Sequence, residues 1–129
     1  MPFTQLQLSA PLLRAIETSG FKIPTEIQQR AIPIILTGSD LMASAQTGTG
    51  KTAAFVLPIL ERLITNQPRP GHGPRVIVLT PTRELATQVS DDIRKFSRFC
   101  GVRFGTIVGG VAYPPQHRLL SRPLDLLVA

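Results

Sequence analysis

Short apolar runs recur along the chain, and longer segments with apolar residues at helical spacing lie between them. The runs, each about five residues long, are Leu41–Ala45, Val76–Thr80, Thr106–Gly110 and Asp125–Ala129. The last three are rich in Val, Ile or Leu, as expected of strands that are buried on both faces. The pattern therefore predicts four strands of a buried sheet.

Four other segments have the spacing of amphipathic helices. We expect helices over Ala10–Ser19, Thr25–Leu36, Thr52–Leu63 and Thr82 to about Phe99. From the first run onward, strands and helices alternate, which is the pattern of a parallel sheet covered by helices. The expected fold class is α/β.

The sequence also predicts one exposed connection and an incomplete domain. Residues 66–74 hold three prolines and two glycines, so neither a helix nor a strand continues through them. The chain ends inside the run Asp125–Ala129, whereas natural termini are usually polar and exposed. We therefore expect a piece of a longer protein, which leaves apolar strand edges uncovered. Because such edges pair with other chains, we also expect self-association.

Composition excludes several classes of protein. With 129 residues, 43% of them hydrophobic, the chain is long and apolar enough for one folded domain. The longest apolar stretches are too short to cross a bilayer, and the N-terminus lacks the features of a secretory signal. A single cysteine, Cys100, permits no internal disulfide and no zinc site. We expect a reducing, cytoplasmic setting and no membrane partner.

The net charge of +6 is concentrated in the second half of the chain. Residues 68–129 carry nine Lys or Arg against four Asp or Glu, and arginine supplies eleven of all fourteen cations. Arginine suits two-pronged contacts with phosphate, so a nucleic acid partner is compatible with this charge. An ordinary solvated basic surface explains the charge equally well.

The segment AQTGTGKT, residues 45–52, follows a predicted strand and opens a predicted helix, as a phosphate-binding loop does. Lys51 would reach the β- and γ-phosphates, and the Thr52 hydroxyl would bind Mg²⁺. Ala45 stands where the general pattern has glycine. The spacing also fits a dinucleotide-binding turn, but the next strand lacks the acidic residue which that site requires. The predicted phosphate-binding residues are Gln46, Thr47, Gly48, Thr49, Gly50, Lys51 and Thr52.

The segment GFKIPTEIQ, residues 20–28, contains a candidate reader of a nucleotide base. The Gln28 amide can form two hydrogen bonds with adenine, and Phe21 or Phe3 could stack on the ring. Thr25 and Gln28 also have the spacing of a helix capping box. Spacing alone favours the capping role.

Two further elements follow predicted strands. In PTRELA, residues 81–86, Thr80 could cap a helix that begins at Pro81. Alternatively, free N–H groups together with Thr82 and Arg83 could hold a nucleic acid phosphate. Gly109 and Gly110 end the third run, either as a simple turn or where another backbone approaches closely.

Together these elements resemble the N-terminal part of a DEAD-box RNA helicase, over nearly the whole chain. GFKIPTEIQ is similar to the Q motif of that family, with Phe3 as its isolated upstream aromatic residue. AQTGTGKT is similar to motif I, in which the family also has alanine first, PTRELA to motif Ia, and Gly109–Gly110 to the GG element. The resemblance implies an incomplete RecA-like P-loop NTPase domain over residues 1–129, truncated before the DEAD strand, with the Q-motif region at residues 1–36.

The resemblance also implies a function: ATP-driven local unwinding of RNA duplexes, with ATP and Mg²⁺ as cofactors. It implies adenine recognition by Gln28, assisted by Thr25, Phe3, Phe21 and Lys22. The residues expected to contact the RNA backbone are Pro81, Thr82, Arg83, Gly109 and Gly110.

The catalytic carboxylates and the second RecA-like domain of the family are not within these residues, so we expect no appreciable ATPase or unwinding activity from the chain alone. Two other functions stay open. One is a related P-loop DNA helicase, and the other is a catalytically inactive nucleotide-binding or interaction module.

Overall fold

The computed structural model describes residues 2–46, 48, 50–66, 73–108 and 124–129. Within these ranges it has a 3-10 helix, four α-helices and three strands. The helices are η1 (Phe3–Gln5), α1 (Ala10–Thr18), α2 (Glu26–Leu36), α3 (Lys51–Thr65) and α4 (Arg83–Phe96). The strands are β1 (Val76–Val78), β2 (Phe104–Thr106) and β3 (Leu126–Val128).

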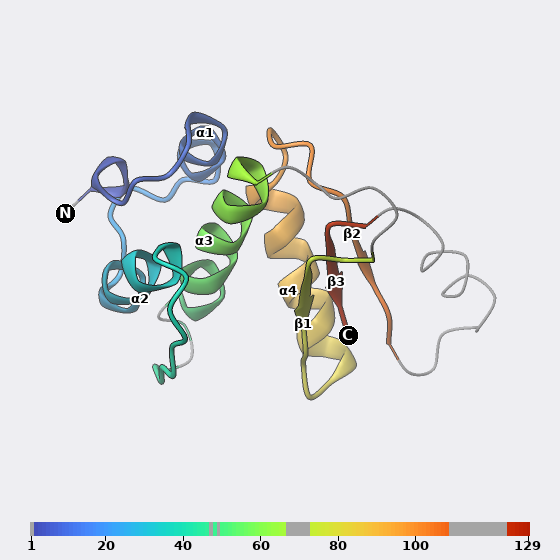
Figure 1. The fold of residues 1–129 in the computed structure, drawn as a ribbon. Coiled ribbons are helices and arrows are strands. Elements are labelled where there is room, and N and C mark those ends of the chain that lie inside the picture. The colour runs from blue at the N-terminus through green and yellow to red at the C-terminus, as the bar shows by residue number, and fades with distance from the viewer. Residues whose placement is uncertain (1, 47, 49, 67–72, 109–123) are drawn as a thin grey trace.

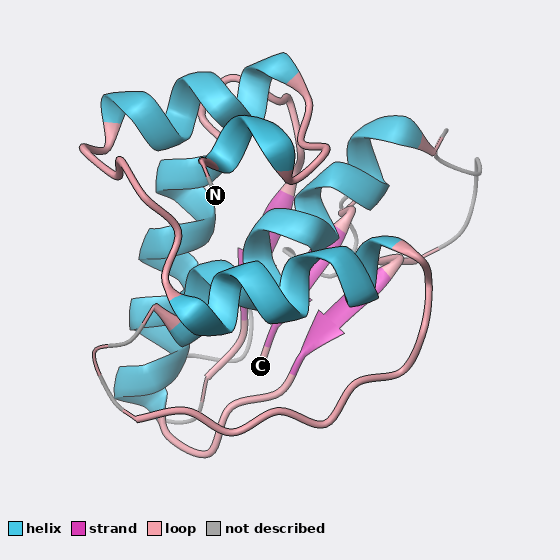
Figure 2. Ribbon diagram, turned by 90° about the vertical axis from the view of Figure 1, so that its left-hand side faces the viewer, coloured by secondary structure: helices cyan, strands magenta, loops and turns pink. Residues whose placement is uncertain are grey.

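The three strands form a parallel sheet in the order β1-β3-β2. Leu126 of β3 lies opposite Val76 on one side and Phe104 on the other. The helix α4 joins β1 to β2, as a parallel connection requires. The described helices lie on one side of the sheet in both views (Figure 1, Figure 2). The predicted α/β class is confirmed.

The core lies between this helical layer and the sheet. All three residues of β3 are buried, which explains its uninterrupted apolar sequence. The apolar stripe of α4 faces inward, and α3 supplies buried residues along its whole length. The largest fully buried apolar side chains are Phe96, Leu12, Ile32, Leu57, Leu60, Ile93 and Leu126.

An acidic residue, Asp125, ties together the starts of the three strands. Its Oδ2 accepts a hydrogen bond from the backbone N–H of Arg103 (2.9 Å), and its Oδ1 accepts one from Nη2 of Arg75 (3.3 Å). The Asp125 carboxylate is buried, so these partners replace the water that it loses. This explains why a charged residue precedes β3.

Two strand predictions need correction. Leu41–Ala45 forms a loop, with Met42 99% exposed, and in the described ranges it pairs with no strand. A strand needs a neighbour for its backbone hydrogen bonds, and apolar character alone does not supply one. The third strand is Phe104–Thr106, earlier than the predicted Thr106–Gly110. Gly109 and Gly110 lie outside the described residues.

Most of the predicted connection at residues 66–74 also lies outside the described residues, because 67–72 are not placed. In the portion of the chain that is described, no helix has the length and apolarity needed to cross a membrane.

Candidate functional site

The start of α3 has the properties of an anion-binding site. Gly50 caps the helix in the left-handed conformation, with φ of 83°, and Gly48 has φ of 85°. In the described part of the loop no side chain caps this helix, and its first turn carries no acidic residue. The first N–H groups and the positive end of the helix dipole are thus available to an anion. Lys51 is exposed beside them.

Gln28 connects this helix start to the start of α2. Its side-chain Oε1 accepts a hydrogen bond from the Thr25 backbone N–H (2.9 Å), and its backbone N–H donates to Thr25 Oγ1 (3.4 Å). These two bonds form the capping box that the spacing predicts. Gln28 Nε2 also donates to the Gly50 carbonyl oxygen (3.2 Å). The buried Gln28 side chain, 1% exposed, therefore joins the start of α2 to the start of α3.

The close packing at this contact explains why residue 50 is glycine. A Cβ atom built on Gly50 would lie 2.3 Å from Gln28 Nε2, well inside van der Waals contact. At Gly48 the same addition meets nothing within 4 Å. Both positions have a positive φ, which favours glycine, but only at Gly50 would an added Cβ also force a neighbouring side chain, that of Gln28, to shift.

The residues at the start of α3 fit a bound triphosphate with Mg²⁺. The uncapped start of α3 and Lys51 offer N–H groups and positive charge to phosphate oxygens. Thr52 offers a hydroxyl to the metal. Among the described residues no three His, Cys, Asp or Glu side chains come together as a metal site. Gln46 is exposed, and Thr47 and Thr49 lie outside the described residues.

Three other predicted adenine-binding residues lie around a groove that is separate from the Gln28–Gly50 contact. Phe3, Phe21 and Lys22 line a groove of about 690 Å³ between η1, α1 and the turn before α2. Phe3 is buried in the core, whereas Phe21 is 37% exposed. Gln28 does not line this groove. The structure thus divides the predicted set between the groove and the Gln28–Gly50 contact.

Two residues of α4 contact Phe21 and were not predicted as part of a site. The rings of Phe21 and Phe96 lie 5.6 Å apart at 45°, and Lys95 Nζ lies 5.1 Å from the Phe21 ring centre. The apolar stripe of α4 predicts that Phe96 points inward. Nothing in the local sequence indicates that its partner is an aromatic residue far away in the chain.

The start of α4 differs in detail from its prediction. Its N-cap is Thr82, whose Oγ1 accepts a hydrogen bond from the Leu85 N–H (3.1 Å), and not Thr80. Pro81 therefore precedes the helix, and Arg83 is its first residue. Pro81, Thr82 and Arg83 are all exposed. Figure 1 places the starts of α3 and α4 at the same, lower end of the molecule.

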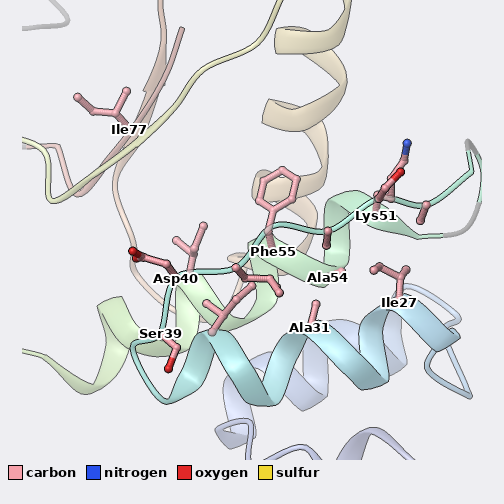
Figure 3. A pocket seen from close by; sticks show the side chains of 14 residues that line it. Ile27, Ala31, Ser39, Asp40, Lys51, Ala54, Phe55 and Ile77 are labelled. Atoms are coloured by element: carbon pink, nitrogen blue, oxygen red, sulfur yellow. The ribbon is translucent and has the colours of Figure 1, made fainter.

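A larger groove, of about 830 Å³, lies between the loop at residues 39–45, α2, α3 and β1. Figure 3 shows Ala31 of α2 and Phe55 of α3 among its lining residues, with Lys51 at one end and Asp40 toward the other. Its wall is mostly apolar, and Ile77 of β1 belongs to it. Lys51 thus borders an apolar hollow beside β1, which is an edge strand of the described sheet.

Cys100 is not a catalytic candidate. Burial raises the pKa of its thiol, and the negative charge of Glu61 raises it further. Reactive cysteines have a lowered pKa, because the thiolate is the nucleophile. Cys100 is therefore a neutral packing residue.

Comparison with known proteins identifies the family. A sequence model described as DEAD/DEAH box helicase matches residues 25–129, most of the chain. The chain belongs to the DEAD/DEAH box helicase family. It is 51% identical over 127 residues to DEAD-box ATP-dependent RNA helicase 28 of Arabidopsis thaliana, across 98% of this chain and 16% of that protein. With ATP-dependent RNA helicase SrmB of Escherichia coli K12 the identity is 46% over 127 residues, across 98% and 29%.

A solved structure of the family agrees with the fold. The crystal structure of a DEAD box protein from the hyperthermophile Methanococcus jannaschii matches with a TM-score of 0.87 at 39% identity. The match covers 99% of this chain and 34% of that one. The α/β, RecA-like prediction is therefore confirmed. The chain spans less than a third of the length of the two helicases named above.

The Gly50 contact in this DEAD/DEAH box chain can be tested by a pair of substitutions. Gly50→Ala should lower the free energy of unfolding by about 1–2 kcal/mol more than Gly48→Ala. Both substitutions strain a left-handed backbone, but only the first displaces the buried Gln28 amide from its partners. Denaturant unfolding measures the difference.

The double variant Gly50→Ala, Gln28→Ala is the control for the clash. The double variant should lose less free energy of unfolding than the two single variants lose in sum, because no Gln28 amide remains for the added methyl to displace. If Gly50→Ala and Gly48→Ala lowered the free energy of unfolding equally, this would contradict the packing of Gln28 against Gly50.

Proposed function

We propose that the protein containing this chain is an ATP-dependent RNA helicase, which hydrolyses ATP to separate short RNA duplexes. The carrying observation is the Gln28–Gly50 contact, which joins a candidate base reader to an uncapped, glycine-led helix start with a lysine beside it. Membership of the DEAD/DEAH box helicase family and relatives named ATP-dependent RNA helicases support the same activity.

Phosphate binding is assigned to the start of α3. Backbone N–H groups of the first turn donate to phosphate oxygens, and Lys51 neutralises their charge. The Thr52 hydroxyl would hold Mg²⁺, and the bound metal would withdraw charge from the phosphate groups. Gly48 and Gly50 let the backbone approach closely, because neither carries a side chain.

Adenine recognition is assigned to Gln28, in addition to its capping role. A glutamine amide has two N–H donors and an oxygen with two lone pairs. In the structure Gly50 uses one N–H, and Thr25 uses one lone pair. One donor and one lone pair remain, the set that adenine requires at N7 and N6. Capping and base reading are therefore compatible, and Phe3, Phe21 and Lys22, which line the groove between η1, α1 and the turn before α2, are assigned a part in the same recognition.

RNA contact is assigned to the start of α4. Thr82 uses its oxygen to cap the helix, but its hydroxyl hydrogen can still donate to a phosphate. The exposed Arg83 adds positive charge at the positive end of the helix dipole. Pro81 shapes the approach to the helix, and the predicted RNA contact also includes Gly109 and Gly110, which lie outside the described residues. The proposed location of the protein is the cytoplasm.

Lys51→Ala tests the phosphate site. It should weaken ADP binding by at least about tenfold, because a charge-assisted contact to phosphate is lost. Arg62→Ala, near the other end of α3, removes the same charge and should leave ADP affinity unchanged. Calorimetric titration measures the ADP affinity of both variants. Equal losses of ADP affinity would contradict the assignment.

The same preparation should show no RNA-stimulated ATP turnover, because activation of the attacking water needs carboxylates that these residues do not supply. Turnover above background by the purified chain would overturn this part of the proposal.

Self-association of the chain is also proposed, through β1. This edge strand exposes Ile77 (60%), and Leu79, which follows it, is 80% exposed. Open strand edges pair with other chains. Sedimentation should show a mass that rises with concentration, and Leu79→Lys should restore the monomer, whereas Leu85→Lys on α4 should not. A monomer at all concentrations would contradict the proposal.

A further inference from the structure

The ring of Phe21 is packed from α4 by an aromatic ring and a cation. Phe96 contacts it at 5.6 Å between ring centres, and Lys95 Nζ lies 5.1 Å from the centre of Phe21 and 5.2 Å from that of Phe96. Phe96 is fully buried, so it forms a fixed wall. The Lys95 ammonium is shared between two rings.

The position of Lys95 is fixed from another direction by a carboxylate. Its Nζ lies 3.5 Å from Asp92 Oδ1, one turn earlier on α4, and both side chains are about one-third exposed. A partly exposed ion pair adds little stability by itself. The lysine stem has many rotamers, and the ion pair with Asp92 selects the one that holds the ammonium over Phe21.

Phe21 also lines the groove that contains the proposed adenine-binding residues Phe3 and Lys22. A flat base stacks well on an aromatic ring whose orientation is already fixed, because less freedom is lost on binding. A ring packed by Phe96 and Lys95 satisfies this condition.

We propose that Lys95 is a positioning residue for adenine recognition, which holds Phe21 in the orientation that stacks on the base. This inference rests on the proposed function, because it requires that the chain binds an adenine nucleotide. Lys95 acts through Phe21 and needs no contact with the nucleotide. Its removal should therefore affect the part of the affinity that depends on the base, and leave the phosphate contacts at α3 unchanged.

The neighbouring Arg94 provides a matched control. It pairs with Asp91 Oδ1 at 2.9 Å and lies over the ring of Phe104 at 5.6 Å. Arg94 thus has the same kind of ion pair and ring contact on the same helix, but with a ring other than Phe21. Arg94→Met and Lys95→Met change the net charge equally, and each keeps an apolar stem for packing.

The test compares calorimetric affinities for ADP and for inorganic pyrophosphate. Lys95→Met should lower the ratio of ADP to pyrophosphate affinity by roughly threefold, the scale expected when one side chain that was held in place must be ordered on binding. Arg94→Met should leave this ratio unchanged, and Lys95→Arg, which keeps a cation over the ring, should restore most of it. Thermal melting of each variant checks that the fold is retained.

Three results would overturn the inference. Lys95→Met could leave the ratio intact, it could weaken pyrophosphate binding as much as ADP binding, or Arg94→Met could have the same effect as Lys95→Met. The wild-type chain tests the proposed function separately. If it binds ADP and pyrophosphate alike, adenine recognition fails and the inference fails with it, whereas a wild-type preference for ADP that survives Lys95→Met overturns the inference alone.

Discussion

The hydrogen bond from the Gln28 side chain to the Gly50 carbonyl is the constraint on which this site depends. It joins the first turn of α2 to Gly50, the residue before α3, although residues 37–50 separate the two helices in sequence. Because the amide is buried, a lost partner would leave a polar group without compensation. The start of each helix is therefore fixed by the position of the other.

This constraint explains why a capping residue can also belong to a binding site. Thr25 and Gln28 satisfy N–H groups at the start of α2, which stabilises that helix locally. The remaining hydrogen-bonding capacity of Gln28 faces no other partner among the described residues, and a base edge could use it. Base recognition on α2 and phosphate binding on α3 would then share one rigid corner, and the relative orientation of base and phosphates would be preorganised.

The parts of the fold that depend on local interactions were predictable from the sequence. The capping box at Thr25 and Gln28 gave the start of α2, and the glycine-lysine segment gave the start of α3 at Lys51, to within a residue. The loop at Leu41–Ala45 was predicted as a strand because its composition is apolar, although pairing depends on a neighbour that local sequence does not reveal. For the candidate site, motif spacing predicted residues on α2, α3 and α4, and their roles stay predictions. The contact between Phe21 and Lys95 was not predictable, since it depends on the packing of distant segments.

The most direct test of this account is a calorimetric titration of the chain with ADP and, in parallel, with GDP. If the free hydrogen-bonding groups of Gln28 read adenine, ADP should bind at least about tenfold more tightly than GDP, as expected for two well-placed bonds to a base edge. Equal affinities would contradict the account, because they would leave Gln28 with its capping role and its contact to Gly50 but without a part in choosing the base.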